Sequence, residues 1–382
     1  MLIKNGKVLT DSWQFEQLDL RITGDTIEKT APAGNLEASC DLREESVLDA
    51  QGLYVVPGLV DIHIHACNGY DFCDAREESV TGMAKYLIKQ GVTSFLAASM
   101  ACDEERLKHV FEVGRKMVES GIPGGAQLRG IHMEGPFFSK AKKGAQSEKY
   151  IIEPDTSMFD RLNTVSGGTI RLVDVAPELP RAMEFIRHAS RHATVSIAHT
   201  TSDYQTAMEA FSNGATHVTH LFNAMPPFSH RDPGVVGAAS DAGADVELIC
   251  DGIHLHPAVI RSVFKWFGDD KVILISDAMM ACGLPDGEYE LGGQAVDVSA
   301  GKATLRDGTI AGSAADLYTC MRRAVAFGIP LESAVRAASC NPARSAGLDQ
   351  QIGSIASGKR ADLLLLDKNL SIVQVICGGQ FC

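Results

Sequence analysis

The stretch PGLVDIHIH, residues 57–65, marks the point at which the chain changes its rhythm. From here on, short apolar runs rich in β-formers alternate with helical patterns. Eight such runs lie at residues 59–65, 92–98, 128–134, 170–175, 194–199, 216–220, 246–250 and 271–277. Strands that alternate with helices form parallel βαβ units, and eight units over this length favour a closed barrel. The sequence therefore predicts an α/β fold, a TIM-like (β/α)8 barrel.

Helical patterns fill the intervals between these runs. Five of them lie at residues 78–89, 104–119, 180–188, 204–212 and 257–267. After the eighth run, residues 291–305 read as a hairpin insertion, and two more helices are expected at 315–327 and 331–338.

Both ends of the chain read as β-structure outside the barrel. Asn5-Gly6 predicts a hairpin between strands at 2–4 and 7–9, and Gly24-Asp25 predicts a second hairpin. Near the C-terminus, strands are expected at 363–366 and 372–376. We expect a small β-sandwich domain formed by the N- and C-terminal segments, residues 1–54 and 347–382, and the (β/α)8 barrel over residues 55–346.

Composition narrows the function classes. The 382 residues are 45% hydrophobic and carry a net charge of −13, which argues against binding to nucleic acid or to an anionic membrane. A phosphate site would therefore have to be a local basic pocket. The ten cysteines form no CxxC pair, and no apolar stretch approaches membrane length. We expect reduced thiols in a soluble cytoplasmic protein, with no membrane or nucleic-acid partner.

Metal-competent side chains fall at the ends of the predicted strands. In barrels of this kind the active site is built at the C-terminal ends of the strands. The residues placed there are His63, His65, Glu134, His199, His220 and Asp277. His63 and His65 have i, i+2 spacing, so both imidazoles face one side of a strand and can chelate one ion. The alternative for this pair is two hydrogen-bonded histidines in a core.

Glu134, His199 and His220 give a plausible three-ligand site with an open position for water. A buried glutamate without a partner is costly, and a metal ion supplies that partner. His132, on the same strand as Glu134 but deeper, is interpreted as a support residue. Asp277 follows a nearly apolar strand, where it is either a helix N-cap or a group that accepts a proton from water.

The same residues carry a resemblance to a known family. The run at 57–65 resembles the opening signature of the amidohydrolase superfamily, and the runs IGSI at 352–355 and GKRAD at 358–362 resemble its C-terminal signature. Within that superfamily the chain is similar from end to end to the N-acetylglucosamine-6-phosphate deacetylases. The narrower motifs are HMEGPF at 132–137, HLFNAM at 220–225, DGIH at 251–254, SDAM at 276–279 and AGS at 311–313.

The resemblance implies roles for individual residues. Glu134, His199 and His220 match the main metal ligands, and Asp277 matches the acid/base. The groups that match substrate contacts are Asn223, the backbone at Ala224, Arg231 and His254. In the family the arginine reaches over from the other subunit, which implies a homodimer with shared sites. Arg231 also lies in a turn-rich loop, and its guanidinium fork suits phosphate, although a solvated loop arginine is the alternative.

Two positions vary within the family. Some members lack the His-x-His pair and hold one metal, whereas this chain has His63 and His65. We therefore expect one or two divalent ions per subunit, and this pair favours two, with Glu134 as the bridge and zinc or iron as the most suitable metals. Gln146 stands where part of the family has a histidine that polarises the acetyl carbonyl. Its amide can donate a hydrogen bond but cannot be cationic.

The expected function is the metal-dependent deacetylation of N-acetylglucosamine 6-phosphate to glucosamine 6-phosphate and acetate, by a metal-activated water with Asp277 as general base and acid. Alternatives are a deacetylase for the galactosamine epimer, a cyclic-amide hydrolase or an aminoacylase. The phosphate-contact set Asn223, Arg231 and His254 argues against the last two. A catalytically inactive barrel that serves as a scaffold would be expected to lack ligands that this chain retains.

Overall fold

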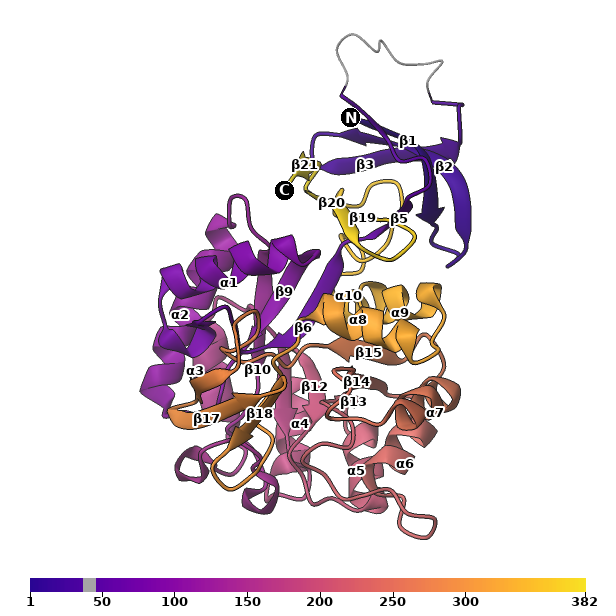
Figure 1. Cartoon of the computed structure of the whole chain (residues 1–382). Coiled ribbons are helices and arrows are strands. Elements are labelled where there is room, and N and C mark those ends of the chain that lie inside the picture. The colour runs from indigo at the N-terminus through magenta and orange to yellow at the C-terminus, as the bar shows by residue number, and fades with distance from the viewer. Residues whose placement is uncertain (37–45) are drawn as a thin grey trace.

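The computed structural model describes residues 1–36 and 46–382, and its largest part is a curled sheet of eight parallel strands (Figure 1). Neighbouring strands follow one another in chain order from β6 to β15. They are β6 (Leu59–Ile64), β9 (Val92–Ala98), β10 (Gln127–Met133), β11 (Ile170–Val175), β12 (Thr194–Ile197), β13 (Ala215–Val218), β14 (Asp245–Ile249) and β15 (Val272–Ile275). All eight predicted strands are confirmed, two with the predicted bounds and the others shifted or shortened by a few residues.

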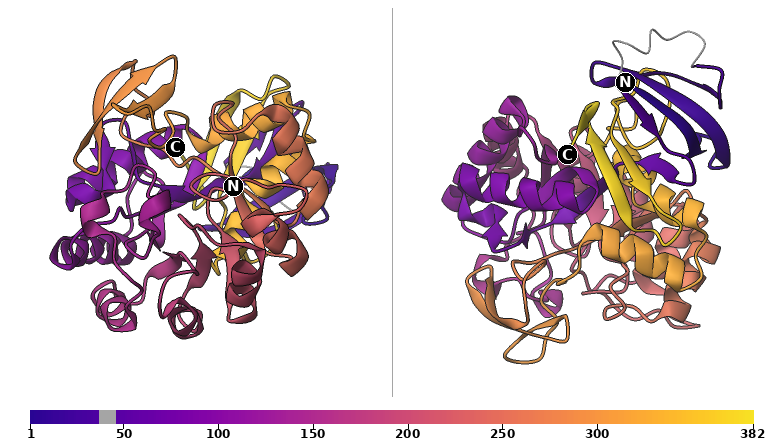
Figure 2. Two further views of the ribbon diagram at one scale, coloured as in Figure 1. Left: turned by 90° about the horizontal axis from the view of Figure 1, so that it is seen from below. Right: turned by 45° about the horizontal axis from the view of Figure 1, so that its top comes forward.

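Backbone contacts join the first and last strands of this sheet. Ile64 and Ala278 form a parallel bridge, the amide of His65 donates to Ala278 O at 3.1 Å, and the amide of Asp277 donates to His63 O at 2.9 Å. The view from below in Figure 2 shows the helices arranged around the strands. The carboxyl ends of β6 and β15 therefore meet at one rim.

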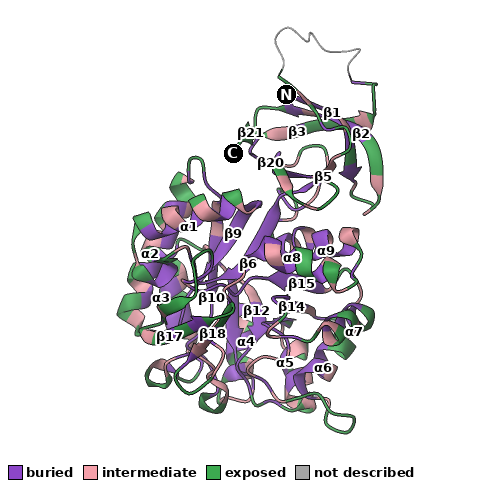
Figure 3. Ribbon diagram, viewed as in Figure 1, coloured by how far each residue is buried: buried purple, intermediate pink, exposed green. Residues whose placement is uncertain are grey.

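Amphipathic helices cover the outside of the curled sheet. In α2, Asp103 caps the N-terminus by accepting from the amide of Arg106, and Leu107, Val110 and Phe111 are buried. Figure 3 shows the same division for the whole layer, with buried strands inside helices that expose their outer faces. The helices are α1 (Glu77–Lys89), α2 (Glu104–Ser120), α3 (Thr156–Val165), α4 (Ala182–Ala189), α5 (Tyr204–Ser212), α6 (Gly234–Ala242), α7 (Pro257–Phe267), α8 (Leu317–Ala326), α9 (Leu331–Ala337) and α10 (Cys340–Ser345).

A second sheet combines strands from both ends of the chain, as expected from the sequence. Its path runs β21-β20-β19-β5-β1-β2-β3, and β4 pairs with β1. The strands are β1 (Leu2–Leu9), β2 (Phe15–Thr23), β3 (Thr26–Pro32), β4 (Val47–Asp49), β5 (Tyr54–Pro57), β19 (Leu363–Leu366), β20 (Ile372–Cys377) and β21 (Gln380–Phe381). In Figure 1 this sheet lies above the curled one, beside both termini.

The predicted hairpin at Asn5-Gly6 is wrong. β1 is one continuous strand from Leu2 to Leu9, and its pairing with β2 shifts register between Ile3 and Gly6. Asn5 has a left-handed φ of 58°, and its amide donates to the buried carboxylate of Asp19 at 2.9 Å. Asn-Gly therefore forms a bulge, which needs the same positive φ as a tight turn. The second predicted hairpin, at Gly24-Asp25, is confirmed by the Thr23–Thr26 pairing of β2 with β3.

The predicted insertion is present, but it has one strand more than a hairpin. The insertion is a three-stranded antiparallel sheet, β16 (Gly287–Leu291), β17 (Gln294–Ser299) and β18 (Lys302–Leu305), and a short pair β7 (Ala66–Cys67) and β8 (Tyr70–Asp71) follows β6.

The nine cysteines in the described part of the chain are free thiols, and Cys40 lies outside it. Among the described residues, no helix has the length and apolar character needed to cross a membrane.

Candidate metal centre and active site

The six predicted rim residues lie together at the carboxyl ends of the strands. His63 is in β6 and His65 follows it, Glu134 comes directly after β10, and the remaining three lie two residues beyond β12, β13 and β15. Each is at most 8% exposed. Strands far apart in the sequence thus bring four imidazoles and two carboxylates into one buried cluster.

Three of these residues leave the extended conformation as their strands end. The φ angles are 45° for His199, 30° for His220 and 46° for Asp277. A left-handed φ at residues other than glycine is uncommon and costs free energy, so it persists only where the surroundings impose it. The amide of Ser139 donates to His199 O at 2.9 Å, and the amide of Asn223 donates to His220 O at 2.9 Å. These bonds hold the turned backbone.

Glu134 lies at the centre of the cluster. Its Oε1 is 3.3 Å from Nε2 of both His199 and His220 and 3.5 Å from Nε2 of His63. Its Oε2 is 3.4 Å from Nε2 of His65, which is also 3.4 Å from Oδ1 of Asp277. Two sets of potential metal ligands therefore share this carboxylate: His63, His65 and Glu134 in one, Glu134, His199 and His220 in the other.

The hydrogen bonds at Nδ1 of His65 and His199 determine which ring nitrogen carries a proton and which one faces the carboxylates. Nδ1 of His65 faces Ala98 O at 3.2 Å, and Nδ1 of His199 faces Lys142 O at 2.8 Å. A carbonyl only accepts, so each Nδ1 carries a proton, and when the ring carries no second proton its Nε2 turns a lone pair toward the carboxylates. Nε2 of His199 also lies 3.1 Å from Nε2 of His220.

Lone pairs that face carboxylate oxygens, and one another, repel unless positive charge lies between them. Nε2 of the buried His63 has no hydrogen-bond partner within the described part of the chain, although it points at this cluster. Imidazole and carboxylate donors are typical ligands of zinc and of other first-row divalent metals. The residues present therefore fit a divalent metal ion.

The histidines of the cluster lower the pKa values of its two carboxylates. Without a metal ion, protonated histidines supply the positive charge: burial by itself raises the pKa of Asp277, but a hydrogen bond from His65 and the charges of neighbouring histidines lower it to about 2. Burial likewise opposes ionisation of Glu134, and hydrogen bonds from His199 and His220 bring its pKa well below the usual range. Both carboxylates are therefore anionic at neutral pH. Asp277 is ready to accept a proton.

A cavity of about 280 Å³ opens above the carboxylates. Of the predicted substrate contacts, those that line it are Gln146, Asn223, Ala224 and His254. Nδ1 of His254 is 2.7 Å from Oδ2 of Asp251, and Asp251 also accepts from the amides of Ile253 and His254. These bonds fix the ring and direct His254 into the cavity.

Gln146 is held by two hydrogen bonds within the cluster. Its Oε1 accepts from the amide of Ala101 at 2.8 Å, and its Nε2 donates to Oε2 of Glu134 at 2.5 Å. The amide thus points at the shared carboxylate. Arg231, by contrast, does not line the cavity. It lies in a separate surface hollow beside Tyr204 and Asp241.

Several residues of the site were not predicted from the sequence. Met100, Leu291, Thr309 and Ile310 line the cavity, and the last three belong to or follow the β16–β18 insertion. The sequence did contain one signal for them: a segment inserted after a parallel strand of this kind of fold lies at the rim where the strands end. Glu247 is a second omission, an acid between the apolar residues Val246 and Leu248 of β14. Burial opposes its ionisation, but the adjacent His63 lowers its pKa to about 2.

Comparisons with known proteins agree with this geometry. The sequence profile described as the Amidohydrolase family matches residues 54–382. The chain is 38% identical over 330 residues to N-acetylglucosamine-6-phosphate deacetylase of Bacillus subtilis (85% of this chain, 83% of the relative). It is 31% identical over 382 residues to N-acetylgalactosamine-6-phosphate deacetylase of Escherichia coli O157:H7 (99% and 98%).

Solved structures give the same picture. A variant of N-acetyl-D-glucosamine-6-phosphate deacetylase from Mycobacterium smegmatis, in complex with N-acetyl-D-glucosamine-6-phosphate, superposes with a TM-score of 0.91 at 34% identity and covers 100% of this chain and 98% of that one. The corresponding enzyme of Pasteurella multocida gives a TM-score of 0.92 at 29% identity, with 100% and 99% coverage.

Proposed function

The chain belongs to the amidohydrolase family, and on that premise we propose that it deacetylates N-acetylglucosamine 6-phosphate to glucosamine 6-phosphate and acetate. One observation carries the proposal: two histidine sets share Glu134, and Asp277 faces them at the floor of a cavity. Relatives that carry the name of this activity match along nearly the whole chain.

Glu134, His199 and His220 would hold one divalent ion, and His63 and His65, with Glu134 as bridge, would hold a second. Zinc and iron suit these donors best. When bound, the metal supplies an activated water and stabilises negative charge on the acetyl carbonyl.

The protein's own residues then move and direct the proton. Asp277 is anionic, so it accepts a proton from the attacking water and returns it to the amine as the amide bond breaks. The backbone bond from its amide to His63 O keeps the carboxylate at the rim. Gln146 donates to Glu134, so we propose that it orients that carboxylate and also contacts the acetyl group.

The phosphate end of the substrate would lie near Asn223, the backbone at Ala224 and His254, which line the same cavity. Nδ1 of His254 is held by Asp251, so Nε2 is the atom that would face a phosphate oxygen. The chain carries a net charge of −13, so a sugar phosphate would need a local site of this kind.

We propose that Arg231 completes this phosphate site from the second subunit of a homodimer. Arg231 does not line its own chain's cavity. Its loop also carries Phe228, which is 44% exposed and lies 5.5 Å, ring centre to ring centre, from Trp266, itself 49% exposed. Exposed paired aromatic rings are typical of a surface that a partner covers.

We further propose that residues 55–346 form a closed (β/α)8 barrel and that residues 1–54 and 347–382 form a separate β-sandwich domain. The terminal sheet has a hydrophobic cluster of its own, which includes Ile3, Leu20, Ile27 and Leu363, and this supports the division. We expect a cytoplasmic location because a sugar phosphate is too strongly charged to cross a bilayer unaided.

The galactosamine epimer is the second candidate substrate, because the E. coli relative that covers nearly the whole chain is named for it. The test is to measure metal content per chain together with acetate release from both N-acetylated amino-sugar 6-phosphates. We expect about two metals and faster release from the glucosamine compound. One metal with rapid release would keep the function and remove the metal role of His63 and His65. Bound metal without release from either sugar would contradict the deacetylase function.

A further inference from the structure

A buried carboxylate lies beneath the metal centre and takes no direct part in it. Glu247, in the middle of β14, is 0% exposed. Its Oε2 lies 2.9 Å from Nδ1 of His63 and accepts from the backbone amide of His220 at 3.1 Å. Its Oε1 has no hydrogen-bond partner within the described part of the chain, and the closest ion-pair contact is Nε2 of His217 at 3.8 Å. Burying such a charge is costly, so its partners matter.

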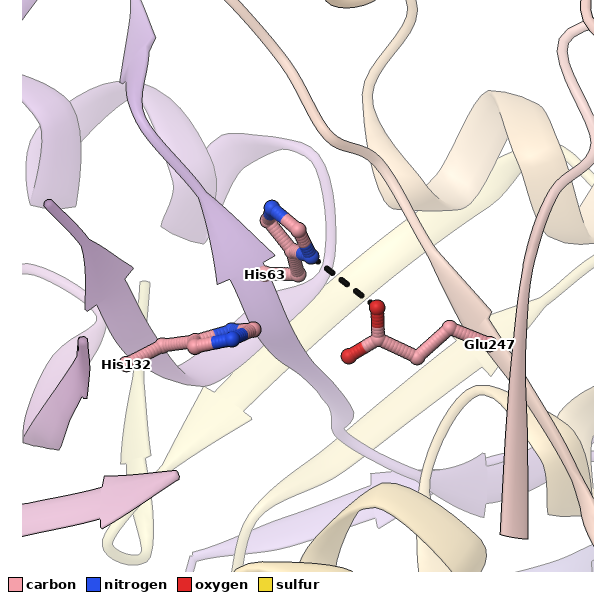
Figure 4. A group of neighbouring side chains, drawn as sticks. All are labelled: His63, His132 and Glu247. Atoms are coloured by element: carbon pink, nitrogen blue, oxygen red, sulfur yellow. Dashed lines mark hydrogen bonds and ion pairs between the residues drawn. The ribbon is translucent and has the colours of Figure 1, made fainter. Parts of the chain in front are cut away.

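Glu247, His63 and His132 are close enough to suggest a third set of metal ligands, but both ring nitrogens of His132 and the facing atoms of His63 and Glu247 already have partners (Figure 4). Nδ1 of His132 faces Ile62 O at 3.1 Å, and its Nε2 is 2.9 Å from Oδ1 of Asp174. In Figure 4 the second ring nitrogen of His63 points away from both neighbours. This nitrogen, Nε2, is the one that faces Glu134 and Asp277. The group is therefore a support beneath the metal centre and not another site.

We propose that Glu247 is a positioning residue that sets the orientation of His63 and ties the two ligand sets of the metal centre together. One oxygen accepts from the side chain of His63, which belongs to the first set, and from the backbone of His220, which belongs to the second. The inference deepens the proposed function and rests on its metal centre.

The physical consequence concerns the proton of His63. A carboxylate that accepts from Nδ1 keeps the proton there, so Nε2 presents its lone pair to the metal position and the ring becomes a stronger donor. His65 and His199 have backbone carbonyls in the corresponding place. His63 alone among these three histidines is thus backed by an anion.

Asp174 provides a matched control. It is also 0% exposed, and its Oδ1 accepts from His132 at 2.9 Å and from the hydroxyl of Thr219 at 3.0 Å. Glu247→Gln and Asp174→Asn each remove one buried negative charge beside a histidine and keep an oxygen that accepts. Only Glu247 is bonded to a proposed metal ligand, His63, whereas the histidine partner of Asp174 is His132, which is not one.

The experiment measures zinc alone, without substrate. Metal-free protein is titrated with zinc against a chromophoric chelator, and the cobalt(II) form gives a visible spectrum. We expect Glu247→Gln to weaken the affinity for one zinc equivalent by about 10- to 100-fold and to alter the cobalt spectrum. We expect Asp174→Asn to lower the melting temperature but to leave both the affinities and the spectrum as in the unsubstituted protein.

Either of two results would overturn the proposal: Glu247→Gln with unchanged zinc affinities and cobalt spectrum, or Asp174→Asn with the same loss of zinc. Glu247→Leu, which removes the acceptor, should lose more zinc than Glu247→Gln. If the leucine variant does not fold, the Gln and Asn pair still decides. Zinc that binds normally to the unsubstituted protein without any acetate release would contradict the substrate and leave the role of Glu247 intact.

Discussion

The carboxyl rim of the curled sheet and the core of the terminal sheet are both deeply buried, but they differ in the kind of residue that they contain. The rim contains four histidines and two carboxylates, and three of the six have a left-handed φ. The sheet is filled mainly by a hydrophobic cluster, which includes Ile3, Leu20 and Leu365. Burial at the rim therefore costs free energy, whereas burial in the sheet supplies it. The polar cluster at the rim and the hydrophobic cluster of the terminal sheet thus lie in different parts of the molecule.

The largest effect of this division is expected at Asp277. Asp277→Asn keeps the size of the side chain but removes the group that accepts the proton. We expect turnover to fall by about 10²- to 10⁴-fold, with bound metal and the unfolding transition nearly unchanged. The measurements are acetate release, metal content and thermal unfolding on the same preparation.

The control for Asp277 is Asp297→Asn, which makes the same change at an exposed position on β17. It should leave all three quantities as they are. Near-normal turnover in Asp277→Asn would remove the proton-transfer role, and loss of metal would show that Asp277 is foremost a ligand.

How far the sequence predicts the rim follows from barrel geometry. Parallel strands place their carboxyl ends at one rim, so a histidine or an acid at the end of each apolar run is enough to predict that they meet. His63, Glu134 and Asp277 are found this way. The left-handed φ of Asp277 and the cavity wall at Leu291 are not, because both depend on contacts between segments far apart in the chain.

Glu247 and Asn5 show two further limits of sequence reasoning. An acid with apolar residues on both sides in a strand indicates a buried charge, but its partner, His63, is 184 residues away in the sequence. Asn5-Gly6 indicates a positive φ, which suits a tight turn and a bulge equally. The bulge prevails because β1 continues through it to pair with β2, β4 and β5.

The opposite change, in the core of the sheet, should affect stability alone. Leu20 is fully buried in the sheet cluster, and no member of that cluster lines the cavity. Leu20→Ala removes buried methyl groups and leaves a void, so we expect a loss of about 2–5 kcal/mol in the free energy of unfolding. Turnover per folded molecule should stay the same. Chemical unfolding and active-site titration give the two numbers.

Val373→Ala on β20 is the matched control, because Val373 is 52% exposed in the same sheet. It should change stability by less than about 0.5 kcal/mol. A large drop in turnover per folded Leu20→Ala molecule would mean that the sheet positions the rim, and the separation between the two regions would then be wrong.

The smallest effect sharpens the comparison most, because it concerns a buried carboxylate that lies in the sheet. Asp19 is 0% exposed, and its oxygens accept from the backbone amides of Asn5 at 2.9 Å and Gly34 at 2.8 Å. Backbone amides, not histidines, donate to this acid, so it holds the bulge in β1 and the turn after β3 instead of a metal. In Asp19→Asn, the new side-chain NH2 group faces one of these backbone amides, so that amide loses its acceptor. We expect a destabilisation of about 1–3 kcal/mol. Zinc affinity and turnover should be untouched, in contrast to Glu247→Gln, which is expected to weaken zinc binding. A drop in zinc affinity for Asp19→Asn would contradict the view that partners, and not burial, decide what a carboxylate does in this protein.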